Sequence, residues 1–173
     1  MVGYAGSPID MPAWIDKVDA VGWGGFGGQC SAKAIAAVLA GNVNPSGRLA
    51  ETFPLHLSDV LSEQSYRDSF VIKYSEGLNV GYRYFDTYGK PVLFPFGYGL
   101  SYSEFVYSDL SARYEDGVIR VCLCVENISE VSGKEVVQVY IGRGREGYPL
   151  KELKDFEKVT LNASEIKKIC ITI

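Results

Sequence analysis

The chain has 173 residues, enough for one large domain or two small ones. Hydrophobic residues make up 47% of it, a share that is typical of a globular protein with a sizeable core. The formal net charge of −4 at pH 7 provides no basic field for nucleic acid. We therefore expect no nucleic acid as a partner. No apolar run approaches the roughly 18 residues of a membrane-spanning helix, so we expect no membrane as a partner either.

A strand at 19–23 is predicted to lead through a glycine cluster into a helix. Apolar residues recur at the spacing i, i+3, i+4, i+7 of an amphipathic helix: Ala32, Ile35, Ala36 and Leu39. Gly41 is predicted to be the C′ residue of this helix. The Asn-Pro-Ser-Gly run at 44–47 then turns the chain into an extended piece at 48–53. This order of strand, helix and strand is typical of an α/β layer.

The glycine cluster also contains the pattern Gly22-x-Gly24-x-x-Gly27, which resembles a dinucleotide-binding fingerprint. A nucleotide site needs an acidic residue at the end of a second strand about 20 residues further on. That distance falls in the turn at 44–47. We therefore interpret these glycines as allowing close packing between strand and helix.

The next segment, 55–70, is polar and has no period, and we interpret it as a surface loop. It contains His56, the only histidine of the chain, which we expect to be a surface or packing residue. Segment 71–86 is rich in aromatic residues that alternate with other types, and this pattern predicts a strand.

Two residues of this aromatic segment are weak candidates for substrate binding. Arg83 lies among tyrosines and can either stack on a sugar or pair with Glu76. Among the carboxylates of the N-terminal part, Glu76 is the one that we consider near a sugar pocket. The alternative, which we favour, is that Glu76 orders the loop beside Arg83.

From about residue 104 the sequence predicts strands only, and short strands at this spacing indicate a β-sandwich. Asp116-Gly117 is a tight hairpin signal between the first two strands. The predicted strands are 105–114, 118–126, 135–141, 153–161 and 165–173.

Four cysteines stand at 30, 122, 124 and 170, without the spacing of a metal site. Cys122 and Cys124 share one face of a predicted strand, and we expect them to be small core residues. This cysteine usage favours a reducing, cytoplasmic setting. We expect no metal and no cofactor.

Three ordered motifs carry a resemblance to a known family: GNVNPSGRL at 41–49 followed by TFP at 52–54, YSEGLNVGYRYFD at 74–86, and FPFGYGLSY at 94–102. They resemble the second, α/β sandwich domain of glycoside hydrolase family 3, the β-glucosidase and β-xylosidase family. The run CSAK at 30–33 departs from the family's usual acidic or glycine residues. Further segments resemble the strands of a fibronectin type III-like domain: VENIS at 125–129, GKEVVQVY at 133–140 and LKDFEKV at 153–159.

The resemblance implies two parts: residues 1–103 as the C-terminal portion of the α/β sandwich domain, and residues 104–173 as the fibronectin type III-like domain. A full sandwich of this kind has about seven strands, so five predicted strands make us expect a truncated domain. Such a truncated domain would expose strand edges, and self-association of the fragment would follow.

The resemblance also implies the chemistry of a retaining β-glycosidase that hydrolyses terminal non-reducing β-linked sugars. In the family an aspartate nucleophile lies on a TIM-type barrel, and a glutamate acid/base lies well before the glycine cluster. Neither can be placed on this sequence, so we assign no catalytic residue and expect the fragment alone to be inactive, with the barrel as its missing partner. The alternative is a stand-alone carbohydrate-binding or scaffold module, with Trp23, Tyr82 and Tyr84 as a sugar-stacking platform.

Overall fold

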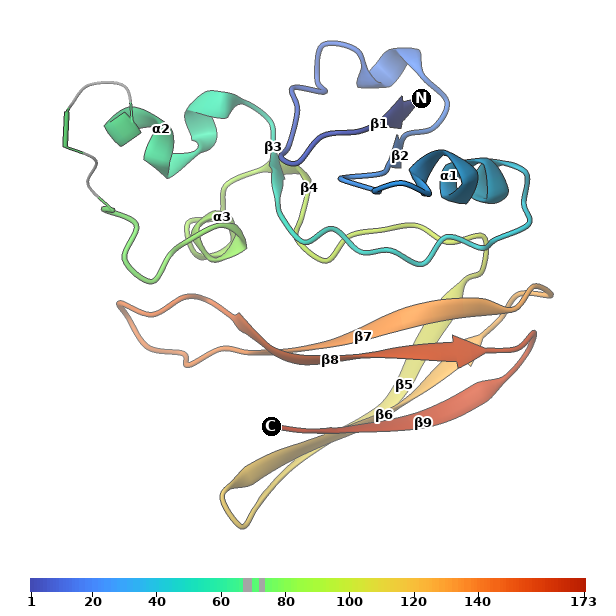
Figure 1. Cartoon of the computed structure of the whole chain (residues 1–173). Helices are drawn as coiled ribbons and strands as arrows, with labels where there is room; N and C mark the ends of the chain where they lie inside the picture. Colours follow the sequence, from blue (N-terminus) through green and yellow to red (C-terminus); the bar gives the residue numbers. More distant parts are fainter. Residues whose placement is uncertain (67–69, 72–73) are drawn as a thin grey trace. The chain divides into compact units, whose positions relative to one another are not determined.

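A computed structural model describes residues 1–66, 70–71 and 74–173 (Figure 1). These residues form two compact units that alternate along the chain. The first, called here the α/β unit, comprises Met1–Ala36, Leu49–Tyr98 and Gly142–Lys151. The second, the sheet unit, comprises Ala37–Arg48, Gly99–Ile141 and Glu152–Ile173. The division of the sequence between residues 103 and 104 remains a prediction, and each unit is described by itself.

The N-terminal half of the chain contains short helices and very short strands. Strands β1 and β2 form a parallel pair, and β3 and β4 form an antiparallel pair. The elements are β1 (Val2–Gly3), η1 (Ile15–Lys17), β2 (Gly22–Trp23), α1 (Ser31–Leu39), β3 (Phe53–Pro54), η2 (Leu57–Asp59), α2 (Leu61–Tyr66), α3 (Tyr82–Thr87) and β4 (Val92–Phe94). None of the described helices has the length and apolar character that crossing a membrane requires.

Helix α1 confirms the predicted helix, and its C-terminal end is a Schellman motif. Gly41 has φ +74°, the left-handed conformation that glycine adopts at low cost. Its N–H donates to Val38 O at 2.9 Å, and the next N–H, of Asn42, donates to Ala37 O at 2.9 Å. Gly41 is therefore the C′ residue, as predicted.

The glycines before α1 are sites of close approach, as predicted. A Cβ added to Gly24 would lie 2.8 Å from the ring of Tyr4 and 3.0 Å from Ile35. One added to Gly27 would lie 2.3 Å from the Cβ of Ser31. Larger residues would separate the chain from the helix, so packing explains these two glycines without a nucleotide.

The prediction of a surface loop at 55–70 was wrong in its described residues, because the segment contains η2 and α2. The helix η2 begins where the backbone N–H of His56 donates to the carboxylate of Asp59 at 3.0 Å. Polar residues that cap their own backbone form helices too short to show an apolar period. His56 is exposed, as expected, and residues 67–69 lie outside the described residues.

The predicted aromatic strand at 71–86 was also wrong where the structure describes it. Gly81, at φ +59°, precedes helix α3, in which Phe85 is the buried residue. Tyr84 and Tyr88 stand four residues apart and their rings lie 5.2 Å apart, which is a helical spacing. Tertiary packing of the aromatic rings overrides their preference for strands. Residues 72–73 lie outside the described residues.

All five predicted strands of the sheet unit are confirmed. They form a three-stranded sheet in the order β5-β6-β9 and a two-stranded sheet β7-β8, and all pairs are antiparallel. The Asp116-Gly117 turn has positive φ at both residues, as a type I′ hairpin requires. The strands are β5 (Phe105–Glu115), β6 (Val118–Asn127), β7 (Gly133–Ile141), β8 (Glu152–Leu161) and β9 (Ile166–Thr172).

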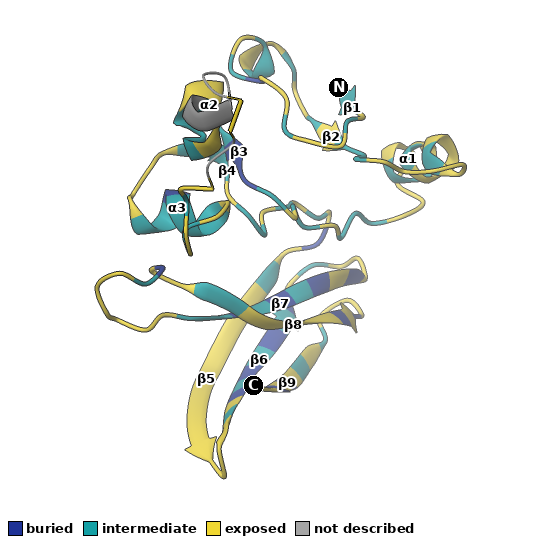
Figure 2. Cartoon of the chain, turned by 60° about the vertical axis from the view of Figure 1, so that its left-hand side comes forward, coloured by how far each residue is buried: buried dark blue, intermediate teal, exposed yellow. Residues whose placement is uncertain are grey.

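The core of the sheet unit lies between its two sheets. Figure 2 shows the buried residues concentrated on β6 and β7, while β5 is mostly exposed. Nine apolar side chains form one buried cluster: Val121, Leu123, Val125, Val137, Val139, Val159, Leu161, Ile169 and Ile171. They occupy alternate positions of their strands, as the period of a β-strand requires. The chain is thus a partial α/β part together with a fibronectin-like β part.

The prediction that Cys122 and Cys124 are core residues was wrong. They share a face, as expected, but Val121, Leu123 and Val125 take the buried positions between and beside them. Arg120 and Glu126 share the face of the two cysteines, so the sequence did carry a signal that this face is turned away from the other sheet. Cys122 instead forms a disulfide with Cys170 on the outer face.

Candidate functional site

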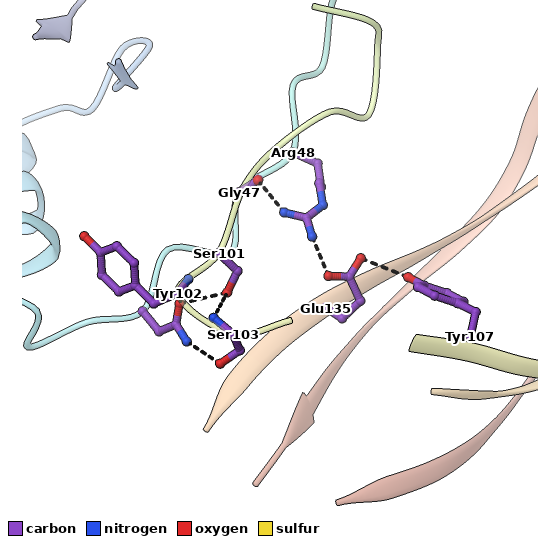
Figure 3. A network of polar contacts seen from close by, with 8 residues as sticks. Gly47, Arg48, Ser101, Tyr102, Ser103, Tyr107 and Glu135 are labelled. Atoms are coloured by element: carbon purple, nitrogen blue, oxygen red, sulfur yellow. Dashed lines mark hydrogen bonds and ion pairs between the residues drawn. The ribbon is translucent and has the colours of Figure 1, made fainter. Parts of the chain in front are cut away.

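A network of polar contacts fastens segment 37–48 to the strands of the sheet unit (Figure 3). This segment contains the Gly-Asn-Val-Asn-Pro-Ser-Gly-Arg run at 41–48, and its partners lie just before β5, just before β7 and on β7. The network has two parts, one around Asn44 and one around Arg48.

The side chain of Asn44 makes four hydrogen bonds. Its Nδ2 donates to Ser103 Oγ at 2.8 Å and to the carbonyl oxygen of Ser132 at 3.0 Å. Its Oδ1 accepts from Ser101 Oγ at 2.8 Å and from the backbone N–H of Tyr102 at 2.9 Å. The two donors and two acceptor sites of the amide are all used. Asn44 therefore holds the turn at 44–47 in one position relative to the segments that lead into β5 and β7.

The second part is an ion pair between the Arg48 guanidinium and the Glu135 carboxylate. The two side chains are only 13% and 8% exposed. Glu135 Oε2 meets Arg48, and Glu135 Oε1 accepts a hydrogen bond from the Tyr107 hydroxyl at 2.9 Å. A buried carboxylate needs such partners, because moving its charge out of water is costly when no cation or hydrogen-bond donor replaces the water.

The Tyr107 hydroxyl is held in its protonated, donating form. Burial raises the pKa of this phenol, and the charge of Glu135 and the hydrogen bond to it raise the pKa further, while Arg48 lowers it in part. Both oxygens of Glu135 therefore have fixed partners. This arrangement positions the chain and offers no free carboxylate for proton transfer.

The backbone also approaches closely in this network. A Cβ on Gly99 would lie 2.3 Å from the carbonyl oxygen of Gly47, which also accepts a hydrogen bond from Arg48 at 3.2 Å. Only a glycine allows this contact between the Asn-Pro-Ser-Gly turn and the Phe-Pro-Phe-Gly-Tyr-Gly-Leu segment. Two of the sequence motifs thus meet in one structural junction.

The two weak candidates for substrate binding lie near each other in sequence but outside this network. Glu76 is half-buried in the turn at 75–78, and the N–H of Asn79 donates to its carbonyl oxygen at 3.0 Å. Arg83 is half-buried in α3. Their contact with a sugar, and their pairing with each other, remain predictions.

The rings proposed as a sugar-stacking platform pack against other rings. Tyr82 stacks on Phe96 with centroids 4.5 Å apart, and Trp23 meets Phe53 edge-on at 5.0 Å. Tyr84 contacts Phe85 at 5.3 Å. Aromatic pairs of this geometry stabilise a fold, which gives these rings a structural role independent of any ligand.

In the part of the chain that the structure describes, no three His, Cys, Asp or Glu side chains gather as a metal site would require. The raised pKa of Glu51 has a simple cause, since partial burial disfavours its charged form. It has no described place in the polar network.

Sequence reasoning missed Asn44, Arg48 and Glu135 as a connected set. One signal was present: Glu135 stands in β7 at the same inward alternation as Gly133, Val137 and Val139. An acidic residue at an inward position of a strand indicates a buried partner. Its partner, Arg48, lies 87 residues away, and no local pattern points to it.

Comparisons with known proteins match this architecture. A model of the glycosyl hydrolase family 3 C-terminal domain matches residues 1–102, and a model of the fibronectin type III-like domain matches residues 135–173. A thermostable β-glucosidase B from Acetivibrio thermocellus is 48% identical over 97% of this chain and 23% of its own. A probable β-glucosidase J from Aspergillus fumigatus is 42% identical over 100% of this chain and 21% of its own.

Solved structures give the same result. A β-glucosidase from Kluyveromyces marxianus superimposes with a TM-score of 0.93 at 36% identity, covering 99% of this chain and 21% of that one. β-Glucosidase 3B from Thermotoga neapolitana, in complex with glucose, has a TM-score of 0.89 at 39% identity, covering 99% of this chain and 25% of that one. The chain therefore spans about a fifth to a quarter of the length of these relatives.

Proposed function

The chain belongs to glycoside hydrolase family 3, and on this premise we propose that it serves as a supporting part of a retaining β-glycosidase. The whole protein would hydrolyse terminal non-reducing β-linked sugars, with β-glucosides as the first class to test. The observation that carries this proposal is the match of nearly the whole chain to proteins named β-glucosidases, at 48% identity in one of them.

The chemistry would be a double displacement between two carboxyl groups about 5 to 5.5 Å apart. In our proposal both groups lie in other parts of the whole protein, as the family resemblance implies, and this chain supplies neither. The chain would contribute structure, without a cofactor. The Asn44 and Arg48 contacts support this role, since they use a family motif for fastening, and both oxygens of Glu135 are occupied by Arg48 and Tyr107.

A chimera tests the proposal most directly. The matching region of the Acetivibrio thermocellus β-glucosidase would be replaced by this chain, and hydrolysis of a nitrophenyl β-glucoside would be measured. We expect activity that is lost when the region is deleted. A chimera that folds, by circular dichroism and gel filtration, but releases no nitrophenol would contradict the proposal.

The purified chain by itself is the matched control. We expect no nitrophenol release and no heat of binding with glucose or cellobiose. Hydrolysis that disappears in Glu76→Gln would place catalysis in this chain and overturn the proposal. Sugar binding without hydrolysis, lost in Tyr82→Ala, would instead favour the stand-alone carbohydrate-binding module.

A further inference from the structure

The disulfide between Cys122 and Cys170 lies on the outer face of the three-stranded sheet. The two residues are directly opposite each other on β6 and β9, with their Cα atoms 4.1 Å apart. Their strand neighbours Val121, Leu123, Ile169 and Ile171 occupy the inward positions and are buried. Cys170 is exposed and Cys122 is half-buried, so a small reagent can reach the bond without opening the core.

The bond joins a central strand to an edge strand. Within the described residues the sheet order is β5-β6-β9, so β9 pairs with β6 along one side only. Seven register pairs and the inward side chains Ile169 and Ile171 hold β9 without the disulfide. The fold therefore has a means of keeping β9 in place when the bond is broken, although an edge strand with one neighbour opens more easily.

The thiol of Cys124 cannot take the place of Cys122 or Cys170 in the disulfide unless the backbone moves. Cys124 lies on the same face of β6, two residues along, but its register partner is Lys168. A diagonal pair across two strands has Cα atoms roughly 7 to 8 Å apart, too far for a disulfide without movement of the backbone. Cys30 is also a free cysteine and belongs to the α/β unit.

From these observations we propose that Cys122–Cys170 is a reversible thiol–disulfide exchange site that controls the opening of the edge strand β9. The thiolate of a small thiol attacks Sγ of Cys170, the more exposed partner. A mixed disulfide forms on Cys170, and Cys122 leaves as a thiolate and takes up a proton. A second small thiolate attacks the small thiol's sulfur in that mixed disulfide, which releases Cys170 as a thiol. The two electrons come from two small thiols, which leave as their own disulfide.

The test uses the purified chain without denaturant, in buffers with different ratios of reduced to oxidised glutathione. Alkylation and mass spectrometry would count free thiols, and hydrogen exchange would follow the amides of β9 and β7. We expect two additional alkylated cysteines in reducing buffer, unchanged circular dichroism, and exchange of β9 amides that is roughly tenfold faster. The amides of β7 should change less. Reoxidation should restore the 122–170 pairing.

Two variants make the interpretation specific. Cys124→Ser should respond as the natural chain does. Cys170→Ser should show fast β9 exchange in both buffers. Reduction that requires urea, reduction that leaves β9 exchange unchanged, or loss of the whole sheet on reduction would each overturn the proposal. These three measurements need only the natural chain, so they decide the matter even if Cys170→Ser does not fold.

Discussion

The sheet unit and the α/β unit bury their apolar side chains very differently. The sheet unit gathers nine of them in one cluster between two sheets. In the described residues of the α/β unit, the buried large apolar side chains are Met11, Phe53 and Phe85, while rings such as that of Phe26 are 89% exposed. Helix α1 buries none of its side chains.

This difference indicates where cooperative stability resides. Stability within a structure follows local burial and contact density, so the well-buried strands β6 and β7 of the sheet unit should open only in global unfolding. The strands of the α/β unit are two or three residues long and have little core to hold them. Segment 37–48 is informative because it belongs to the sheet unit, although it begins with the last three residues of α1.

The largest effect should come from breaking the ion pair that joins this segment to strand β7 of the sheet unit. Arg48→Ala leaves Glu135 buried without its cation, and we expect a loss of about 4 kcal/mol in the free energy of unfolding. Urea denaturation followed by the β-sheet circular dichroism signal would measure it. Lys154→Ala removes the more exposed pair with Glu152 and should cost less than about 1 kcal/mol. Equal losses in the two variants would show that the Arg48 pair is no more than a surface contact.

One buried and one exposed leucine provide a matched pair of substitutions. Leu161 is 0% exposed in the sheet unit and Leu39 is 69% exposed at the end of α1. We expect Leu161→Ala to lower the free energy of unfolding by about 3 kcal/mol, through lost burial and a cavity. Leu39→Ala should change it by at most about 0.5 kcal/mol. The link between local burial and stability, on which the comparison of the units depends, fails if the exposed leucine proves as costly as the buried one.

The Asn44 amide provides a smaller test of the same fastening. Asn44→Ala leaves the N–H of Tyr102 and the hydroxyls of Ser101 and Ser103 without this partner, and we expect a loss of about 2 kcal/mol. Asn42→Ala, at an exposed neighbouring position, is the control and should be nearly neutral. Thermal unfolding of the two variants side by side would measure the difference. If Asn44→Ala proves neutral, the segment is held instead by the Arg48–Glu135 pair and by the hydrogen bond from the Tyr102 hydroxyl to Val38 O.

The strands of the sheet unit could be predicted because their signals are local. Alternation of apolar residues and the Asp116-Gly117 turn each lie within a few residues, and the same holds for the Gly41 end of α1. Helices α2 and α3 could not be predicted this way. They are six residues each, and α3 is set by ring contacts such as that of Tyr82 with Phe96.

The polar network was predictable only in part. The inward position of Glu135 follows from strand alternation, but the identity of its partner depends on how distant segments meet. The outward position of Cys122 could also have been predicted, because Arg120 and Glu126 share its face of β6. The partners of Glu135 and Cys122 could not, because the pairing of distant segments is a tertiary property that a single sequence does not show.

The smallest effect concerns the turn between β8 and β9, at the edge of the sheet unit. The pKa of Glu165 lies below its ordinary value of 4.5, chiefly because its carboxylate accepts a hydrogen bond from the backbone N–H of Asn162 at 2.6 Å, with Lys167 nearby. A carboxylate with a lowered folded-state pKa stabilises the fold above its unfolded pKa, and this contribution is lost as the pH falls through the lowered value. Because the Glu165 side chain lies in a surface turn and remains 27% exposed, we expect a local change in the turn with no global unfolding.

An NMR titration of the Asn162 amide between pH 6 and pH 2 would measure this change, a range set about the ordinary carboxyl value of roughly 4. The amide shift should follow the ionisation of Glu165, with a midpoint below 4.5, and should vanish in Glu165→Gln. Glu130→Gln, in the turn between β6 and β7, should leave it intact. A midpoint at or above 4.5 would mean that the carboxylate does not hold the Asn162 amide in solution. The edge strand β9 would then depend on its ladder with β6 and on the Cys122–Cys170 bond, without help from the turn.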